Sequence, residues 1–210
     1  DTTAAAETTA APGTTGGEAT TAAACAEGKT LEAGSLTLAT GDPAFPPYMI
    51  DDDPTSGEGF ESALALAVAK AMGFEGDQVK WIRTSFDTAV AGSDSGFDFN
   101  LQQFSINDER KQVVSFSDPY YTANQAILGY ADGPAKDVTK LSDLKALKIG
   151  AAAGTTSLQF VEEVIQPDTE VFAFNSNADA KAALDAGQID LIVTDVPTGL
   201  YISAVEIEGT

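Results

Sequence analysis

The chain has 210 residues, and 32 acidic against 11 basic side chains give it a formal net charge of −21 at pH 7. This balance excludes the basic surface that a nucleic-acid-binding protein uses to neutralise phosphates. No His and a single Cys are present, which excludes His or Cys-cluster metal sites and a disulfide within the chain. We therefore expect no cofactor, no metal and no nucleic-acid partner.

Residues 1–30 are rich in Ala, Thr and Gly and contain no aromatic side chain. Such a segment buries too little apolar surface to offset the entropy lost on ordering, so we expect a disordered tether. The rest of the chain is long enough for a substantial core. It contains no apolar run of membrane-spanning length, and we expect any secretion signal to have been removed.

From Ser35 onward the sequence alternates between strand and helix patterns. Ser35–Thr40 lies between two glycines and predicts a strand. Residues 59–74 predict a helix that Gly73 ends. Its expected apolar face is Phe60, Ala63, Leu64, Ala67, Val68 and Ala71. The following elements are expected to be strands at 78–83 and 97–105 and a short helix at 85–93.

The stretch FSINDERKQVVSFSDPYY, residues 104–121, predicts a helix start and then a strand. Asn107 is a good N-cap residue, but Arg110 has the wrong charge for a first helical turn. We therefore expect a negative group between Arg110 and the helix start. The Ser/Phe alternation over 114–121 predicts a strand that ends in a turn.

The alternation begins again after residue 125 and predicts a second block. Strands are expected at 147–154, 170–174 and 188–195, with helices at 155–165 and at 177–187, the latter capped by Asn177. Two such blocks predict an α/β fold with two small parallel-sheet lobes. The expected divisions are a first lobe at 31–126, a second at 127–195 and a return toward the first at 196–210.

Ligands of parallel α/β sheets gather beyond the carboxyl ends of the strands, near helix N-termini. Four loops fall at such places, and a cleft between two lobes would bring them together. The loops contain donors that suit a carboxylate, in Ser105, Arg110, Thr155 and Thr156, and acids that suit a cation, in Asp42 and Asp195. A ligand with one carboxylate and one ammonium, an α-amino acid, satisfies both halves.

Each of these residues also has an ordinary structural explanation. Arg110 can pair with Asp108 or Asp118 on the surface, and Thr155 can be a plain helix cap. Asp195 can be a turn residue. The nearby aromatic residues, Phe45, Phe104, Tyr120 and Tyr121, are more often core than ligand platform. Four such loops at equivalent strand ends favour a binding site over these separate explanations.

The order of five stretches resembles the amino-acid-binding proteins of ABC importers: TGDPAFPPY, GFESALALAVAKAMG, FDFNLQQFSINDERKQVVSFSDPYY, LKIGAAAGTTS and ALDAGQIDLIVTD. These proteins form the periplasmic-binding-protein type II family, also called extracellular solute-binding protein family 3. The resemblance covers Ser35–Tyr201. It implies a two-lobed type II fold in which each lobe is a small sheet flanked by helices and the ligand lies in the interlobe cleft.

The resemblance also implies roles for single residues. Arg110 is similar to the family arginine that clamps the ligand α-carboxylate, with Ser105 and Thr156 as its partners. Asp195 is similar to the residue that receives the α-ammonium. Phe45 resembles an aromatic that covers the ligand side chain. Asp42 resembles a residue often near the ligand.

The sequence departs from the family pattern at several places. Asn107 replaces a common Thr, NLQQ replaces a small-residue stretch, and Ala63 stands at an acidic position. Relatives continue with a further strand and helix in the first lobe, so we expect a C-terminally shortened chain.

The resemblance implies a monomeric extracytoplasmic solute-binding protein that delivers an amino acid to an ABC transporter permease, lipid-anchored upstream of the tether. The alternative is an enzyme, because some dehydratases of aromatic amino-acid precursors share the fold. Without His, its general acid would be Asp, Glu, Lys or Tyr. None stands out in the four loops, so we expect no catalytic residue.

The residues before Arg110 predict the class of amino acid. Gln103 and Ser105 share one face of a strand, so both are expected to face the cleft, and Phe104 completes the expected set of binding residues. The four loops hold no second Arg or Lys, which disfavours Glu and Asp as ligands. We expect a neutral polar amino acid first and a basic one second.

Overall fold

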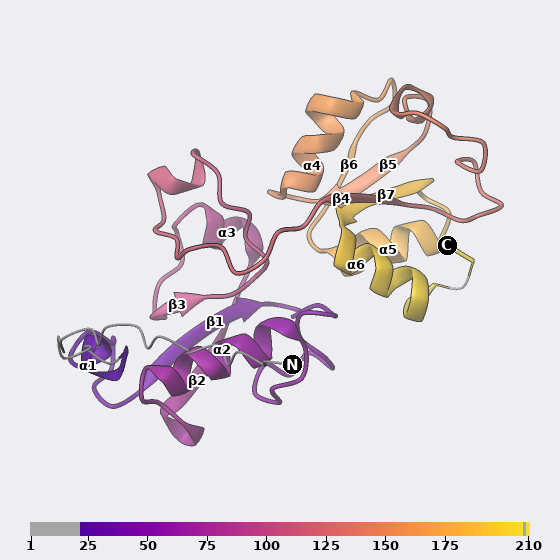
Figure 1. The fold of residues 1–210 in the computed structure, drawn as a ribbon. Helices are drawn as coiled ribbons and strands as arrows, with labels where there is room; N and C mark the ends of the chain where they lie inside the picture. Colours follow the sequence, from indigo (N-terminus) through magenta and orange to yellow (C-terminus); the bar gives the residue numbers. More distant parts are fainter. Residues whose placement is uncertain (1–21, 208) are drawn as a thin grey trace, which may run out of the picture.

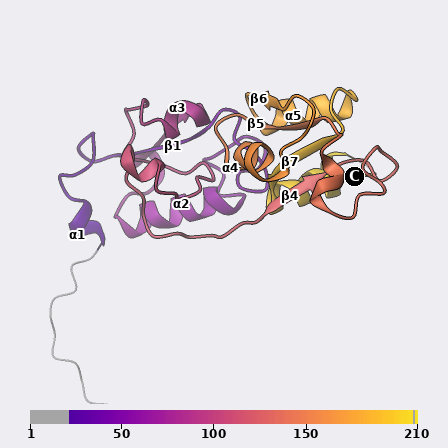
Figure 2. The ribbon, with the colours of Figure 1, turned by 90° about the horizontal axis from the view of Figure 1, so that it is seen from above.

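The computed structural model describes residues 22–207 and 209–210, which form two lobes, each on its own sheet (Figure 1). The first sheet has the strand order β2-β1-β3 and the second the order β4-β7-β5-β6. Residues 119–125 lead from the first lobe to the second (Figure 1). The two lobes lie side by side when seen from above (Figure 2).

The first sheet is parallel, with β1 at its centre. Its strands are β1 (Leu36–Gly41), β2 (Val79–Thr84) and β3 (Phe99–Asn100), and the connections contain α2 (Phe60–Ala71), η1 (Gly76–Gln78) and α3 (Phe86–Val90). Every residue of β1 is buried, which the small and apolar sequence LTLATG allows. The core of this lobe consists of Leu36, Leu38, Ala65, Ala69 and Leu101.

The buried face of α2 differs from the predicted one. Ala63 and Ala67 are exposed, and Phe60 is 41% exposed. The fully buried residues are Glu61, Ser62, Ala65 and Ala69. Because Ala occupies many positions, the helix has no strong apolar stripe, and tertiary packing selects its buried face. This packing buries the side chain of Glu61 inside the first lobe.

The start of α2 packs closely on the preceding loop. The N–H of Phe60 donates to the carbonyl of Pro47 at 3.1 Å, and the N–H of Glu61 donates to the carbonyl of Tyr48 at 2.9 Å. Loop carbonyls therefore cap the helix. Gly59 permits this approach, because its φ is 93° and a Cβ there would lie 2.5 Å from the carbonyl oxygen of Tyr48.

Gly59→Ala is expected to destabilise the protein by about 2–4 kcal/mol, because it combines a strained positive φ with a backbone clash. Gly76→Ala is the matched control. Gly76 also has a positive φ, of 56°, but a Cβ there meets nothing within 4 Å. We expect that control to cost about 1 kcal/mol. Urea unfolding of both variants measures the difference, and equal losses would show that the clash contributes nothing.

The second sheet is mixed. Its strands are β4 (Gln125–Leu128), β5 (Ile149–Ala152), β6 (Phe172–Phe174) and β7 (Leu191–Asp195). β5 pairs in parallel with β6 and β7, whereas β4 pairs antiparallel with β7. The last three strands match the predicted ones. β4 was not predicted, because its four-residue QAIL run is short and does not alternate between apolar and polar residues.

The helices of the second lobe include the two predicted ones and a third, after β7, that was not predicted. They are α4 (Thr156–Phe160), which continues as the π-helical η4 (Val161–Ile165), α5 (Asn177–Asp185), and α6 (Val196–Tyr201), which continues as the π-helical η5 (Ile202–Glu206); η3 (Leu141–Leu144) is a 3-10 turn. The prediction took Asn177 as the cap, whereas in the structure Asn177 is already the first helical residue of α5. Its cap is Ser176, whose hydroxyl accepts from the N–H of Asp179, and not Asn177.

The last described residues belong to the second lobe. Ile202 and Ile207 lie in one buried cluster with Leu128 and Ile192 of the second sheet. The segment 196–207 was expected to turn back toward the first lobe. Ile202 and Ile207 instead pack in the core of the second lobe, and α6 lies in that lobe (Figure 1).

Four predicted segments have a different local structure. The expected strand at 97–105 pairs over β3 alone, and residues 114–121, all of them described, form no strand. Around Arg110 the helix is a single 3-10 turn, η2 (Arg110–Gln112). The expected tether contains the helix α1 (Ala22–Ala26), since Ala is the best helix former. Residues 1–21 of that tether lie outside the described part.

Within 22–207 and 209–210, no helix combines the length and the apolar character needed to cross a membrane.

Candidate functional site

Three hydrogen bonds between described residues join the lobes at the carboxyl ends of their strands. They link Tyr48 Oη to Asp195 Oδ1 (2.8 Å), Ser105 Oγ to Thr156 Oγ1 (3.2 Å) and Arg110 Nη2 to the carbonyl of Gly154 (2.9 Å). Four of the predicted site residues are among these six. The lobes are therefore closed on each other at the place where the sequence predicts a ligand.

Arg110 is buried between the lobes, with 7% of its surface exposed. Its guanidinium donates to the carbonyl of Ser105 at 2.8 Å and to that of Gly154. Its central carbon lies 5.4 Å from the centroid of the Phe86 ring, which stacks on Phe104 at 5.1 Å. The charged group is thus held by neutral acceptors and an aromatic face.

The surface pairing that was the ordinary explanation for Arg110 is not formed. Asp108 pairs with Lys111 at 3.2 Å, and no ion pair of Arg110 is found in the described part of the chain. Burial lowers the pKa of Arg110, although Glu109 opposes this effect. Asn107 holds the turn, because its Oδ1 accepts from the N–H of Arg110 at 2.8 Å. A buried cation without an anion is a suitable receptor for a carboxylate.

The two threonines at the start of α4 have different roles. Thr155 is the N-cap: its hydroxyl accepts from the N–H of Leu158 at 3.1 Å and donates to the carbonyl of Ala152 at 2.6 Å. The hydroxyl of Thr155 therefore serves as an ordinary helix cap, which was the structural alternative to a binding role. Thr156 faces the first lobe and contacts Ser105.

Asp195 ends β7 and caps α6. Its carboxylate accepts from the N–H of Thr198 at 3.0 Å, from the Thr198 hydroxyl at 2.8 Å and from Tyr48 across the cleft. Burial raises the pKa of Tyr48, and the Asp195 carboxylate adds to the rise. All these donors are neutral, so the negative charge of Asp195 is oriented but not neutralised.

Two predicted residues are placed differently from their expected roles. Asp42 is exposed, and the structure does not bring it to the other site residues. Phe45 packs against the buried cluster of the second lobe, which contains Leu128 and Ile202. Phe45, a residue of the first lobe, therefore makes a packing contact with the second lobe.

Gln103 turns away from its expected position. It has a positive φ of 53°, its N–H donates to Glu61 Oε1 at 2.9 Å, and its side-chain amide donates to Glu61 Oε2. Tyr120 also donates its hydroxyl to Glu61 Oε1. The neighbouring Phe104 stacks on Phe86 beside Arg110. The amide of Gln103 is thus held by an acid in this arrangement.

Sequence reasoning missed Glu61, Tyr48 and Phe86. Glu61 is 0% exposed, and burial raises its pKa, with the charge of Asp195 acting in the same direction and the hydrogen bonds from Tyr120 and Gln103 opposing it. A signal was available: Glu61 stands four and eight residues before the buried Ala65 and Ala69, on one face of α2.

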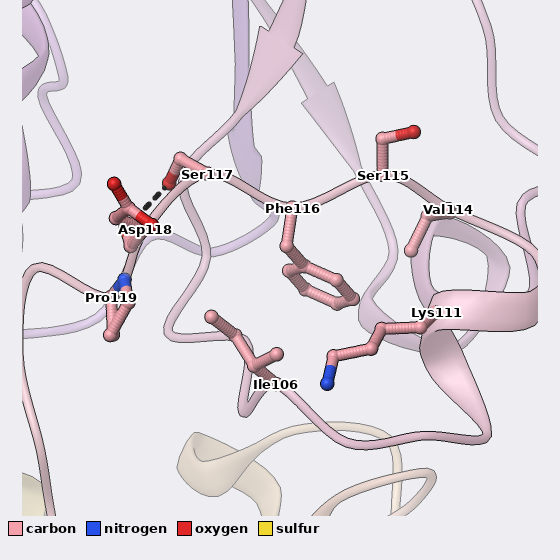
Figure 3. Close-up of a pocket in the computed structure, with 8 residues that line it drawn as sticks. All are labelled: Ile106, Lys111, Val114, Ser115, Phe116, Ser117, Asp118 and Pro119. Carbon is pink, nitrogen blue, oxygen red and sulfur yellow. Dashed lines mark hydrogen bonds between the residues drawn. The ribbon is translucent and has the colours of Figure 1, made fainter.

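A surface cavity of about 460 Å³ is lined by residues 106, 111 and 114–119. Figure 3 shows Phe116 pointing toward Ile106 and Lys111, while the Ser115 hydroxyl points away. None of the predicted site residues lines the cavity. Within the described chain, no group of three or more acids or Cys is arranged to hold a metal ion.

Comparison with known proteins gives a family and a fold. Residues 36–158 match the family of bacterial extracellular solute-binding proteins, family 3. A glutamine-binding protein of Geobacillus stearothermophilus is 32% identical over 139 residues, which are 66% of this chain and 52% of that protein. An L-arginine-binding protein of Pseudomonas aeruginosa is 29% identical over 154 residues, 72% of this chain and 58% of its own length. The chain thus spans about half the length of these curated relatives.

Solved structures agree with the fold. An ancestral amino acid-binding protein, described as a precursor of cyclohexadienyl dehydratase, superposes with a TM-score of 0.72 at 32% identity, covering 84% of this chain and 77% of that one. An ancestral arginine-binding protein bound to arginine gives 0.69 at 33% identity, covering 80% and 74%. The predicted two-lobed type II fold is confirmed.

Proposed function

We propose a function from the premise that the chain belongs to the bacterial extracellular solute-binding proteins, family 3. It captures a free amino acid outside the cytoplasm and delivers it to the membrane permease of an ABC importer. One observation carries this proposal: Arg110 is a buried cation between two lobes, held by neutral acceptors alone among the described residues. The names of the relatives, which are amino-acid-binding proteins, support the same class of ligand.

The two halves of the site bind opposite ends of the amino acid. Arg110 takes the α-carboxylate in place of the carbonyls of Ser105 and Gly154, since a guanidinium binds a carboxylate bidentately. Asp195 takes the α-ammonium, because its present donors leave its charge unneutralised. The ligand contacts both lobes at once, so binding favours the closed arrangement. We propose a ligand with a neutral polar or basic side chain.

The setting of the protein is part of the proposal. We infer a monomer that works at the outer face of the cell membrane, with a lipid anchor upstream of the Ala/Thr/Gly-rich residues 1–30. The extracellular location of the family supports this setting. A composition of this kind is typical of flexible tethers.

A dehydratase-type enzyme is the second candidate, and one observation favours it. Glu61 is a buried acid with a raised pKa, as a general acid requires. The named relatives are binding proteins, which favours capture over turnover. Loss of a prephenate-like substrate in the presence of the protein would support the enzyme instead.

A thermal-shift screen of the twenty amino acids tests capture. A ligand at 100 times its Kd stabilises a binding protein by about 2.7 kcal/mol, which raises Tm by roughly 5–10 °C at this size. We expect such a rise for one amino acid or a few related ones. No shift with any of the twenty would contradict the proposal, and D-enantiomers serve as the matched control for binding at the α-carbon.

A further inference from the structure

Glu61 is a buried acid that the amino-acid site described so far leaves without a role. Its carboxylate is fully enclosed and accepts hydrogen bonds from neutral groups, the Gln103 N–H, the Gln103 amide and the Tyr120 hydroxyl. The ion pairs found among the described residues include neither Glu61 nor Asp195. A buried carboxylate is costly unless a cation pairs with it. Without a cation beside it, burial raises the pKa of Glu61, and a cation brought to its carboxylate would favour the charged form.

The two unpaired acids lie in the same half of the cleft. Tyr48 donates to Asp195, and the charges of both Asp195 and Glu61 raise the pKa of Tyr48, after the larger effect of burial. The charge of Asp195 also adds to the rise in the pKa of Glu61. The charges of Glu61 and Asp195 are therefore close enough to affect each other. The part of the site proposed for the α-ammonium contains two acids, Asp195 and Glu61, whereas the α-ammonium supplies only one positive charge.

We propose that Glu61 is a specificity-determining residue that selects amino acids with a cationic side chain. This inference rests on the proposed function. The two carboxylate oxygens of Glu61 have different partners and therefore different proposed roles. Oε1 is oriented by the Gln103 N–H and by Tyr120, whereas Oε2 is held by the side-chain amide of Gln103, which can rotate away. An ammonium or guanidinium displaces that amide and pairs with Oε2.

The proposal reverses the order predicted from the sequence. That order placed the Gln103 amide against the ligand and gave a neutral polar amino acid first. In the structure the amide already donates to Glu61, so it stands where a ligand cation would stand. An arginine or lysine ligand supplies a cation to Glu61, whereas a neutral ligand leaves this buried acid without one.

Arginine and citrulline form the sharpest pair of probes, because they share shape and differ in side-chain charge. Calorimetry on the full chain is expected to show arginine binding roughly tenfold or more tighter than citrulline. In Glu61→Gln the advantage is expected to fall to less than about threefold, while citrulline affinity is kept, which also reports an intact site. Glu58→Gln, an exposed acid three residues earlier, is the matched control and should keep the wild-type ratio.

The outcomes separate this inference from the proposed function. Equal binding of arginine and citrulline by the wild type would overturn the role of Glu61 and leave amino-acid capture standing. A Glu61→Gln variant that weakens both probes equally would show a structural role and overturn the inference as well. Binding of another amino acid but of neither probe also overturns it. Failure of all amino acids to bind overturns the proposed function, and the inference with it.

Discussion

Arg110→Ala is expected to weaken amino-acid binding by roughly 30-fold to several thousand-fold, which corresponds to about 2–5 kcal/mol. The guanidinium is buried between the lobes and has no anion among the described residues. Removing it leaves the ligand carboxylate buried without a partner, and that penalty dominates the loss. Calorimetry with the amino acid that raises Tm most in the screen measures the effect.

Two variants control for charge and geometry. Lys111→Ala removes the same charge from the next residue, which is exposed and paired with Asp108. We expect it to change affinity less than about threefold, as for surface pairs. Arg110→Lys keeps the charge but loses the two-pronged donor geometry, so it is expected to fall between the other two. A loss below threefold in Arg110→Ala would contradict the carboxylate-receptor role.

The sequence was a good guide wherever local pattern decides structure. Ser105, Thr156 and Asp195 lie at the ends of predicted strands or just after them, where turn signals and helix starts stand in the sequence, and these signals are local. The unusual cation at Arg110 indicated a negative partner, and the structure buries that side chain without one. The prediction that four loops meet at one cleft followed from the rule that ligands gather at the carboxyl ends of strands.

The sequence was a poor guide wherever tertiary contacts decide. The buried face of α2 depends on what packs against a helix rich in Ala, so the burial of Glu61 could not be seen from apolar spacing that starts at Phe60. The turn of Gln103 depends on that same buried acid. Residues 114–121 alternate like a strand, but pairing needs a neighbour that local pattern cannot supply.

Asp195→Asn is expected to weaken amino-acid binding by about 2–5 kcal/mol, comparable with the loss in Arg110→Ala. Asn is as good an N-cap as Asp, so its amide oxygen should keep the hydrogen bond from the Thr198 N–H, and the Thr198 hydroxyl can turn to accept from the amide NH2 group. What is lost is the negative charge that faces the α-ammonium beside Tyr48.

Asp185→Asn is the matched control for Asp195→Asn, because Asp185 is an exposed acid of the same lobe that accepts a hydrogen bond from Tyr130 at 3.0 Å. Calorimetry on both variants should show a large loss for Asp195→Asn and less than about a threefold change for the control. Unfolding by urea should give similar midpoints, since neither change removes a buried apolar group. Equal affinities in the two variants would show that Asp195 serves α6 alone and that the ammonium is bound elsewhere. A selective loss would place the two ends of the ligand on opposite lobes, Arg110 on one and Asp195 on the other, which is the arrangement that closes the cleft.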